Sequence, residues 1–383
     1  MNQKNTEQKR ILNIVAGPLV NRGVEKVLMS YYKNIDRNKI QFDFITPEMC
    51  KNDEMRNAIS SLGGQLFELN IIEDDKVKWL FLYKKALRAF LSSHHYEIVM
   101  ITTGSIPVLA MATYVAKIAG VKTRIVYSHN AGILSKRYKI IKMISMPVLR
   151  FLPTHYWACS EVAGHYTFPN AVQNRIKIIP NAIDSSLFTY DSKTRTRVRK
   201  ELDVEDKFVV GHIGAFIPQK NHSFLIDVFF ELRSKCPNVI LLLIGSGEKE
   251  GEIRNKVEAL NLSDSVIFYG NTYKAHEYYQ AMDCFVFPSL YEGLGIVAIE
   301  AQAAGLRTLC SEAIPQEAKI TEQLEYMSLS DSPKKWADKV LTYTNYHRKN
   351  MQQSIIDAGY DIQSSVKEFE EICIASTGEF TNG

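Results

Sequence analysis

Two glutamates, Glu292 and Glu300, stand eight positions apart around a pair of glycines. Their segment, residues 288–305, has the sequence PSLYEGLGIVAIEAQAAG, in which a proline ends a predicted strand, Gly293 and Gly295 permit a tight turn, and the remainder favours a helix. The exposed amides at the start of such a helix suit a phosphate, so Glu300 could accept both hydroxyls of a ribose and Glu292 could reach a neighbouring sugar. By composition alone, the simpler interpretation is that both are ordinary charges favoured by the helix dipole.

A regular alternation of strands and helices must position these residues. Short apolar runs rich in Val, Ile and Phe alternate with longer amphipathic segments along the chain, which is the pattern of parallel strands joined by crossover helices. The predicted strands cover 12–16, 42–46, 98–102, 124–128, 156–160, 176–179, 208–213, 239–244, 266–269, 284–288 and 308–310. Between them, an amphipathic helix is predicted over 24–32.

The alternation breaks once, at residues 179–184, which are followed by a polar stretch from 191 to 207. We therefore predict an α/β protein with two doubly wound, Rossmann-like domains, over residues 1–182 and 183–360. Ligands of such sheets bind beyond the carboxyl ends of the strands. The natural site is then the cleft between the domains.

Length and composition exclude several classes of protein. The 383 residues suit two domains, and a hydrophobic fraction of 46% excludes a disordered, collagen-like or coiled-coil chain. The six cysteines lie at least 26 positions apart, which gives no support to a zinc ribbon or a dense disulfide framework and fits a reducing cytosol. The apolar stretch 11–20 contains a glycine and a proline, so it predicts a strand and a turn rather than a signal peptide or a membrane span.

The net charge of +4 conceals a strong asymmetry. The first 182 residues hold 25 of the 46 basic and 13 of the 42 acidic residues, a net charge of +12, which leaves −8 for the rest. No acidic residue lies between Glu97 and Glu161, an interval with eight Lys and Arg. This basic region must meet water, phosphate or an anionic surface.

Short motifs are spread over most of the chain. They are Gly17 with the turn 21–25, Ser128-His129-Asn130, Ile179-Pro180-Asn181, residues 214–221, Ile244-Gly245-Ser246-Gly247, and the E-x(7)-E pair Glu292 and Glu300. In this order and spacing they resemble the retaining glycosyltransferases of family 4. The resemblance implies the GT-B fold, in which two Rossmann-like domains face each other and a C-terminal helix, at about 361–383 here, packs back on the first domain.

The resemblance also implies that the second domain binds a nucleotide-sugar donor and the first faces the acceptor. The donor-binding residues would be Gly17, Lys220, Gly245, Leu294, Gly295 and Glu300. Glu300 would hold the ribose, and the amides near Leu294 and Gly295 would meet the diphosphate. Lys220 would neutralise the diphosphate, on which charge accumulates as the glycosidic bond breaks. With this work done by the protein, no metal ion and no further cofactor are expected.

His129 and Glu292 are the residues implied in catalysis. Glu292 would contact the transferred sugar, and His129, at the carboxyl edge of the first sheet, would contact the donor sugar or the reacting groups. Without the resemblance, a structural histidine is the better interpretation, just as Gly17 and Gly23 could be plain turn glycines. Retention normally suggests a carboxylate nucleophile, but the family has no agreed residue for that role. We therefore expect front-face attack by the acceptor hydroxyl, with the departing phosphate helping to remove its proton.

One position departs from the family's pattern. The loop before Lys220 usually has an arginine directly after its glycine, where this chain has Ala215. The loss of one charge-assisted contact costs about 1.5–3 kcal/mol. His212 or Gln219 could compensate; otherwise the protein would be a weak or partner-dependent enzyme.

A basic and apolar segment covers residues 135–152. It combines Lys136, Arg137, Lys139 and Lys142 with Tyr138, Ile141, Ile144, Met146, Leu149, Phe151 and Leu152. Such a helix can lie on an anionic membrane surface, or it can pack on the core with a solvated basic edge, and Pro147 is expected to limit its length. Nucleic acid has no support as a partner, because no binding motif accompanies these cations.

The expected protein is thus a retaining hexosyltransferase that moves a hexose or N-acetylhexosamine from a nucleotide sugar, with a UDP-sugar as the expected donor. The acceptor would be a growing or lipid-linked glycan of a bacterial capsule, exopolysaccharide or lipopolysaccharide. It would be cytoplasmic, with peripheral contact to the inner face of the cell membrane if the basic helix lies there. The alternatives are a nucleotide-sugar epimerase of the same fold and an inactive partner subunit. The tyrosines at 31, 32, 278 and 279 are expected to pack helices rather than to stack on bases.

Overall fold

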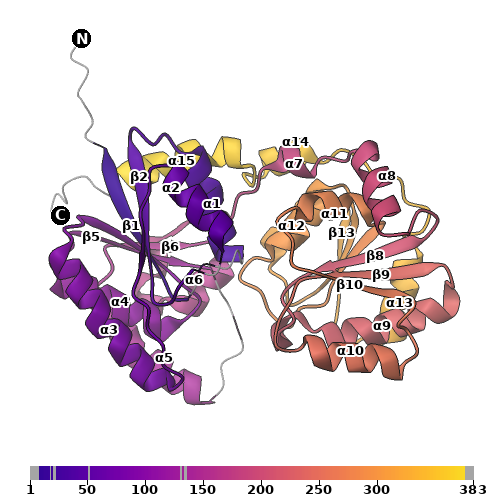
Figure 1. Cartoon of the computed structure of the whole chain (residues 1–383), viewed down its shortest axis with the longest axis horizontal. Coiled ribbons are helices and arrows are strands. Elements are labelled where there is room, and N and C mark those ends of the chain that lie inside the picture. The colour runs from indigo at the N-terminus through magenta and orange to yellow at the C-terminus, as the bar shows by residue number, and fades with distance from the viewer. Residues whose placement is uncertain are drawn as a thin grey trace, which may run out of the picture. The chain divides into compact units, whose positions relative to one another are not determined.

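The structure, a computed structural model, describes residues 8–17, 19, 23–50, 52–129, 132 and 136–375. The chain forms two compact units, Met1–Ala182 together with Ile362–Gly383, and Ile183–Asp361. Each unit contains one sheet of parallel strands with helices on both faces (Figure 1). The predicted α/β class with two doubly wound sheets is confirmed.

The sheet of the first unit has seven strands in the order β3-β2-β1-β4-β5-β6-β7. They are β1 (Lys9–Val15), β2 (Ile40–Thr46), β3 (Leu66–Glu68), β4 (Ile98–Thr102), β5 (Thr123–Ser128), β6 (His155–Ala158) and β7 (Ile176–Ile178). The central strand β4 is buried at every position, because helices cover both faces of the sheet. This is why its sequence is a continuous apolar run rather than an alternation.

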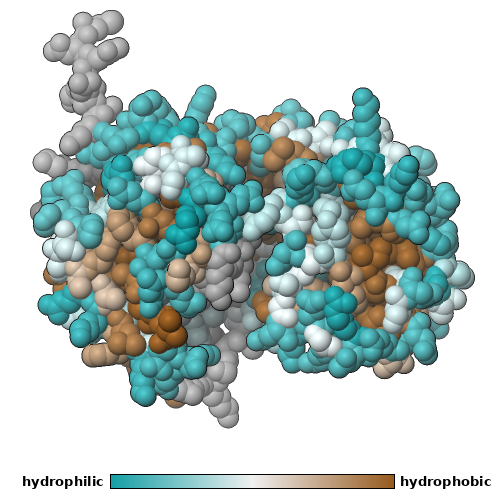
Figure 2. Space-filling view, in the orientation of Figure 1, coloured by the Kyte–Doolittle hydropathy of each residue, from teal (hydrophilic) through white to brown (hydrophobic). Residues whose placement is uncertain are grey.

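The helices of the first unit divide between the two faces of its sheet. They are α1 (Gly23–Asn34), α2 (Asp53–Ser61), α3 (Lys76–Ser93), α4 (Ile106–Ile118), α5 (Lys136–Phe151), α6 (Glu161–Thr167), the short 3-10 helix η1 (Asn170–Arg175) and α15 (Ile362–Ala375). Figure 1 shows α3, α4 and α5 on one side, and α1 with the C-terminal α15 on the other. Phe369 of α15 stacks on Tyr31 of α1, with ring centroids 4.1 Å apart. On the opposite side, Figure 2 shows apolar side chains reaching the surface around α3 and α4.

The sheet of the second unit has six strands in the order β10-β9-β8-β11-β12-β13. They are β8 (Phe208–Ile213), β9 (Val239–Ile244), β10 (Val266–Gly270), β11 (Cys284–Phe287), β12 (Arg307–Ser311) and β13 (Leu324–Met327). Strands β8 and β11 are neighbours in the sheet although 70 residues of the chain lie between them. The loops that follow them therefore leave the same edge of the sheet side by side.

The helices of the second unit also cover both faces. They are α7 (Ser185–Phe188), α8 (Ser192–Glu201), η2 (Pro218–Lys220), α9 (His222–Lys235), α10 (Glu250–Ala259), α11 (Ala275–Ala281), α12 (Ile296–Ala303), η3 (Gln316–Ala318), α13 (Pro333–Leu341) and α14 (Gln352–Asp357). In Figure 1, α9, α10 and α13 lie on one side of the sheet, and α8, α11 and α12 on the other. Trp336 of α13 is fully buried against α9, where its ring meets Phe224 edge to face.

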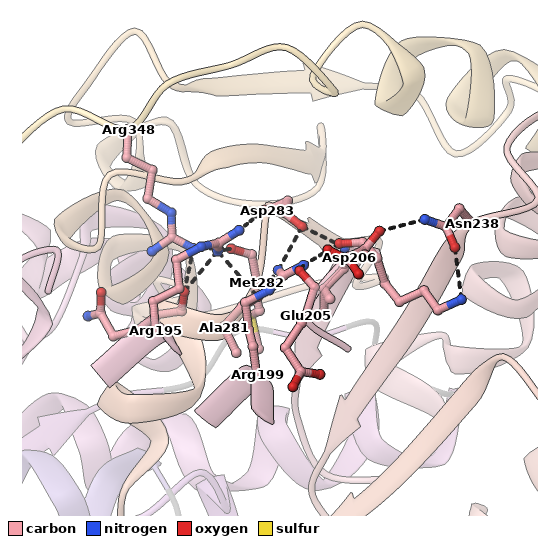
Figure 3. Close-up of polar contacts among 12 residues, drawn as sticks. Arg195, Arg199, Glu205, Asp206, Asn238, Ala281, Met282, Asp283 and Arg348 are labelled. Carbon is pink, nitrogen blue, oxygen red and sulfur yellow. Dashed lines mark hydrogen bonds and ion pairs between the residues drawn. The ribbon is translucent and has the colours of Figure 1, made fainter. Parts of the chain in front are cut away.

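An arginine cluster holds the end of α11 against the start of β11 (Figure 3). Asp283 is its centre: its carboxylate lies 2.5 Å from Arg195 Nη2 and 3.1 Å from Arg199 Nη1, and it accepts the Val209 amide at 2.7 Å. These two arginines and Arg348 also donate to the carbonyls of residues 279–282, at the end of α11. Cations at the carboxyl end of a helix satisfy its last carbonyls and its dipole.

Three predictions about elements were wrong or incomplete. Strands β3 and β13 were not predicted, because each is a short outer strand of three or four residues that is only partly buried and so has no clear apolar pattern. Pro147 does not limit α5, which continues from Lys136 to Phe151. An interior proline removes one backbone hydrogen bond and crowds the carbonyl four residues earlier, but α5 packs along α4, and this packing supports the continuous helix.

Candidate functional site

The candidate site of the second unit is built from two loops at the carboxyl ends of β8 and β11. The Leu290 amide donates to the Gln219 carbonyl at 2.8 Å, and the Gln219 side chain donates to the Tyr291 carbonyl at 2.9 Å. Asn221, which begins α9, donates from its side chain to the Pro288 carbonyl at 3.2 Å. These bonds hold residues that are about 70 positions apart in one fixed arrangement.

Lys220 and Glu292 form an ion pair within this arrangement. Lys220 Nζ lies 2.6 Å from Glu292 Oε1, and the side chains are only 16% and 9% exposed. The ammonium also lies 4.9 Å from the centroid of the Phe287 ring, at the end of β11. The structure therefore brings together the cation and the first glutamate that the sequence predicted for one site.

The turn before α12 requires a glycine. Gly295 has φ +85°, and a Cβ there would lie 3.2 Å from Ile314 and 3.3 Å from Phe287. That Cβ would also lie 3.8 Å from Cγ of Glu292, so the start of α12 adjoins the ion pair. Leu294 is buried and directs the chain into the helix. The first amides of α12 and the Lys220 ammonium thus lie in one region, which suits an anion.

Gly245, at the end of β9, has a different steric role. Its φ is +145°, and an added Cβ would lie 2.0 Å from the Gly214 carbonyl oxygen. The chain after β9 therefore passes directly over the loop after β8, and the amide of Phe216 in that loop donates to the Ser246 carbonyl at 3.0 Å. Any larger residue at 245 would push the loop that carries Lys220 out of place.

Glu300 lies in the second turn of α12 and is 8% exposed. The hydroxyl of Tyr279, from α11, lies 2.9 Å from Glu300 Oε2. Tyr279 packs as the sequence predicted, but its polar contact to Glu300 was missed. The available signal was general: a buried tyrosine hydroxyl usually has a hydrogen-bond partner.

Two buried histidines lie beneath the loop after β8. His212 Nδ1 lies 2.8 Å from the Val286 carbonyl, and the ring of His222 stacks on Phe216 with centroids 4.2 Å apart. Burial lowers the pKa of His212 to about 4 and that of His222 to about 2. Both imidazoles are neutral at pH 7, so His212 does not supply a second positive charge in place of the one missing at Ala215. Gln219 is uncharged and bonded to the Tyr291 carbonyl.

His129 follows β5 in the first unit and is held from two sides. Its Nδ1 lies 3.0 Å from Asn181 Oδ1, and its ring lies 3.9 Å from that of Tyr127. Burial lowers the pKa of His129 to about 3, so it is neutral at pH 7. Because Asn181 Oδ1 can only accept, Nδ1 carries the hydrogen and Nε2 is an acceptor. Nε2 is buried and has no hydrogen-bond partner within the described part of the chain.

The glycine at position 17, after β1, is not required by packing. A Cβ added at Gly17 or at Gly23 meets nothing within 4 Å. Of the motifs found in the sequence, Asn21, Arg22 and Asn130 lie outside the described residues. The two units each carry part of the expected site, and one site that combines them stays a prediction.

Comparisons with known proteins agree with these motifs. The sequence profile of the family described as "Glycosyl transferases group 1" matches residues 194–361. The putative glycosyltransferase EpsF of Bacillus subtilis (strain 168) is 31% identical over 380 residues, which cover 94% of this chain and 95% of that protein. The UDP-Gal:alpha-D-GlcNAc-diphosphoundecaprenol alpha-1,3-galactosyltransferase of Escherichia coli is 22% identical over 395 residues, covering 97% and 98%.

Solved structures show the same fold. The crystal structure of Anabaena HepE in complex with UDP-glucose covers 96% of this chain and 99% of its own, with a TM-score of 0.75 and 19% identity. Such a likeness confirms the GT-B fold that the motifs implied. With the long match to EpsF, it gives the family: this chain belongs to the group 1 glycosyltransferases and is a glycosyltransferase of the GT-B fold.

Proposed function

We propose that this glycosyltransferase is a retaining hexosyltransferase, which moves a hexose or N-acetylhexosamine from a UDP-sugar to a growing, lipid-linked glycan of a bacterial surface polysaccharide. The observation that carries the proposal is the ion pair of Lys220 and Glu292 beside the first turn of α12. In the proposed site, the Lys220 cation would face the diphosphate and the neighbouring Glu292 carboxylate would face the sugar hydroxyls. Glu300 lies about one turn further along the same helix.

The donor would bind with its diphosphate between Lys220 and the amides near Leu294 and Gly295. Negative charge grows on the leaving phosphate as the glycosidic bond breaks, and a fixed cation and helix terminus stabilise it without reorganisation. Glu300 would accept the two ribose hydroxyls. This arrangement needs no metal ion, and we propose that the enzyme works without one.

The chemistry at the sugar would use a carboxylate and a neutral imidazole around the anomeric carbon. Glu292 would accept hydroxyl hydrogens of the transferred sugar, and His129 Nε2, an acceptor because Nδ1 faces Asn181, would accept another. The acceptor hydroxyl would attack from the face that the phosphate leaves, and its proton would pass to the departing phosphate oxygen. A covalent glycosyl adduct on Glu292 would overturn this mechanism in favour of double displacement.

The UDP-sugar and the lipid-linked acceptor are supported by the relatives. The Escherichia coli relative is named for a UDP-galactose donor and a diphosphoundecaprenol acceptor, and HepE was solved with UDP-glucose. Both resemble this chain over nearly its whole length. An acceptor of this kind is presented at a membrane surface.

The test is calorimetric titration of the purified chain with UDP, GDP and ADP in the presence of EDTA, followed by transfer assays with UDP-sugars. Selective binding of UDP and a product with the anomeric configuration of the donor would support the proposal. An inverted product would refute retention, and binding that requires a divalent ion would refute the metal-free site. Conversion of the sugar nucleotide without an acceptor would identify an epimerase. Absence of binding to any of the three would leave the inactive partner subunit.

Replacement of Ala215 by arginine is expected to strengthen binding of UDP. Ala215 follows Gly214, where an added Cβ would lie 3.3 Å from the Lys220 side chain, so residue 215 is close to the predicted diphosphate site. The nearby His212 is neutral and adds no positive charge. One added charge-assisted contact is worth about 1.5–3 kcal/mol, or about ten- to a hundredfold in affinity. Calorimetry of wild type and A215R would measure it, and A215Q would separate charge from bulk. Equal affinities for wild type and A215R would show that the site is already complete.

We also propose that the first unit contacts an anionic membrane through α3, α4 and α5. On α5, Ile140, Met143 and Ile144 are 56%, 67% and 69% exposed and share one face. On α3, Val77 and Phe81 are 69% and 66% exposed. The opposite face of α5 packs on the core, as one interpretation of the segment expected, and the exposed face is the one proposed to meet the membrane.

The charges around this apolar surface favour anionic lipid. Lys84 of α3, Lys117 of α4 and Lys139 of α5 are exposed on these helices, and each cation near such a surface contributes about 1 kcal/mol. Lys142, which the sequence placed among them, instead turns inward to the Tyr166 carbonyl, and burial lowers its pKa. Residue 135 lies outside the described residues. No helix in the described ranges is long and apolar enough to cross a bilayer.

Cosedimentation with vesicles is expected to show this contact. The wild type should bind vesicles that contain phosphatidylglycerol and bind vesicles of pure phosphatidylcholine weakly. Both kinds of vesicle can take up the apolar side chains, but only the anionic lipid also attracts the lysines. I144E should reduce binding to the anionic vesicles about tenfold, since it removes an apolar contact and adds a repelled charge. F230E is the control, because Phe230 is an exposed residue of α9 in the second unit. Equal binding by wild type and I144E would contradict the proposed surface.

A further inference from the structure

We propose that Tyr279 is a positioning residue, which fixes the carboxylate of Glu300 for the two ribose hydroxyls of the donor and thereby sets the preference for ribonucleotides over 2′-deoxyribonucleotides. The inference rests on the proposed function, in which Glu300 holds the ribose. It adds a residue of α11 that does not itself touch the donor.

The contact is well defined. Tyr279 Oη lies 2.9 Å from Glu300 Oε2 and 3.2 Å from the Val297 carbonyl, one turn earlier on α12. Tyr279 is fully buried, and its ring lies 5.6 Å from that of Phe285 and 5.7 Å from that of Phe188. Because it is fully buried and packs against these two rings, the Tyr279 ring has little freedom to turn. The hydroxyl is therefore a fixed reference point for Glu300.

The direction of the hydrogen bond is also fixed. Burial, and then the nearby Glu300 carboxylate, raise the pKa of Tyr279 well above its ordinary value, so the phenol keeps its proton and donates it. A donor to one oxygen restrains rotation of the carboxylate plane. To accept from two neighbouring ribose hydroxyls, the carboxylate plane must be turned so that each oxygen faces one hydroxyl. The restraint on this plane therefore matters most for a ligand that has both hydroxyls.

Hydrogen bonds also hold the main chain at Tyr279 in place. Arg348 donates to the Tyr279 carbonyl at 2.9 Å and to the Gln280 carbonyl at 3.1 Å. Arg195 donates to the same Gln280 carbonyl at 3.0 Å. The arginine cluster thus fixes the end of α11 from which Tyr279 reaches α12.

The chain provides a matched control in the adjacent residue. Tyr278 belongs to the same helix, and its hydroxyl bonds to the hydroxyl of Tyr269. Tyr278→Phe removes the same atom from the same helix without touching Glu300. Thermal melting of both variants would show that each is folded.

The experiment measures dissociation constants for UDP and 2′-deoxy-UDP, and likewise for the GDP and ADP pairs, by calorimetry. Tyr279→Phe should weaken UDP binding about tenfold, leave 2′-deoxy-UDP within about twofold, and so remove most of the discrimination. Tyr278→Phe should bind as the wild type. In the Glu300→Ala background, Tyr279→Phe should have no further effect on UDP, because the two residues act as a unit.

The outcomes separate the inference from the function on which it rests. If the wild type binds none of the nucleotides, the proposed function fails and the inference falls with it. If the wild type prefers UDP to 2′-deoxy-UDP and Tyr279→Phe keeps the same ratio, the inference alone is overturned. An equal loss for both ligands that persists in the Glu300→Ala background would also overturn it, because it would show a merely structural role.

Discussion

Replacement of Lys220 by alanine is expected to lower kcat/KM for the donor about 10²- to 10³-fold. Lys220 is the cation that the structure places beside the start of α12, and the position that usually carries a second cation holds Ala215. Removal of one fixed group that stabilises transition-state charge typically costs a factor of this size. Initial rates of transfer, measured against donor concentration, would determine the change.

The control for this variant is Lys335→Ala. Lys335, in α13, forms an exposed ion pair with Asp331 at 2.6 Å and is 63% exposed, so its loss should leave kcat/KM within about twofold. A Lys220→Ala enzyme that is folded and retains more than a third of the wild-type kcat/KM would contradict the assigned role.

Glu292→Gln separates the two members of the ion pair. In Lys220→Ala the Glu292 carboxylate, 9% exposed, loses its partner, so part of any effect comes from an uncompensated charge. Glu292→Gln instead releases Lys220 toward the diphosphate. UDP should therefore bind at least as tightly as to the wild type while sugar transfer falls. Parallel losses of UDP affinity in both variants would show that the pair acts only as a structural unit.

Asp283→Ala should lower the free energy of unfolding of the second unit by about 3 kcal/mol. The variant leaves Arg195, Arg199 and the Val209 amide without the carboxylate that binds all three. Breaking a buried ion pair on one side costs about 3–5 kcal/mol, and the 21% exposure of Asp283 places this case at the lower end. Urea unfolding followed by fluorescence and circular dichroism would give the change.

Asp338→Ala is the matched control for this loss. Asp338 pairs with Lys235 in the same unit but is 54% exposed, so the change should cost less than about 1 kcal/mol. Equal destabilisation by the two variants would show that the arginine cluster contributes no more than a surface pair. Asp283→Asn, which keeps hydrogen-bond acceptors but no charge, should fall between them.

The sequence was sufficient for features that depend on local pattern. The buried strands β4 and β9 are continuous apolar runs, so their place in a parallel sheet could be predicted without knowing their neighbours. The strand, glycine turn and helix around Gly295 were equally clear, because a positive φ and a helix start have local signals. Where the pattern is weak, as in the short outer strands β3 and β13, the prediction failed.

The motifs also named the candidate residues in advance. Lys220, Glu292 and Glu300 were singled out by their spacing and by the family that this spacing resembles, and the family is confirmed by the long match to EpsF. Their roles toward the donor stay predictions. What spacing could not express is which residues lie in contact, since the strand order of the sheet brings β8 beside β11.

Only the tertiary structure decided the pairings and the charges. It joined Lys220 to Glu292 and Tyr279 to Glu300, in each case across distant parts of the chain. It also made His212 neutral, because burial removes the water that stabilises a charge, and it turned Lys142 inward to the Tyr166 carbonyl. Residue type and spacing determine which chemistry is available in this protein, whereas sheet order and burial determine which groups meet and which of them carry charge.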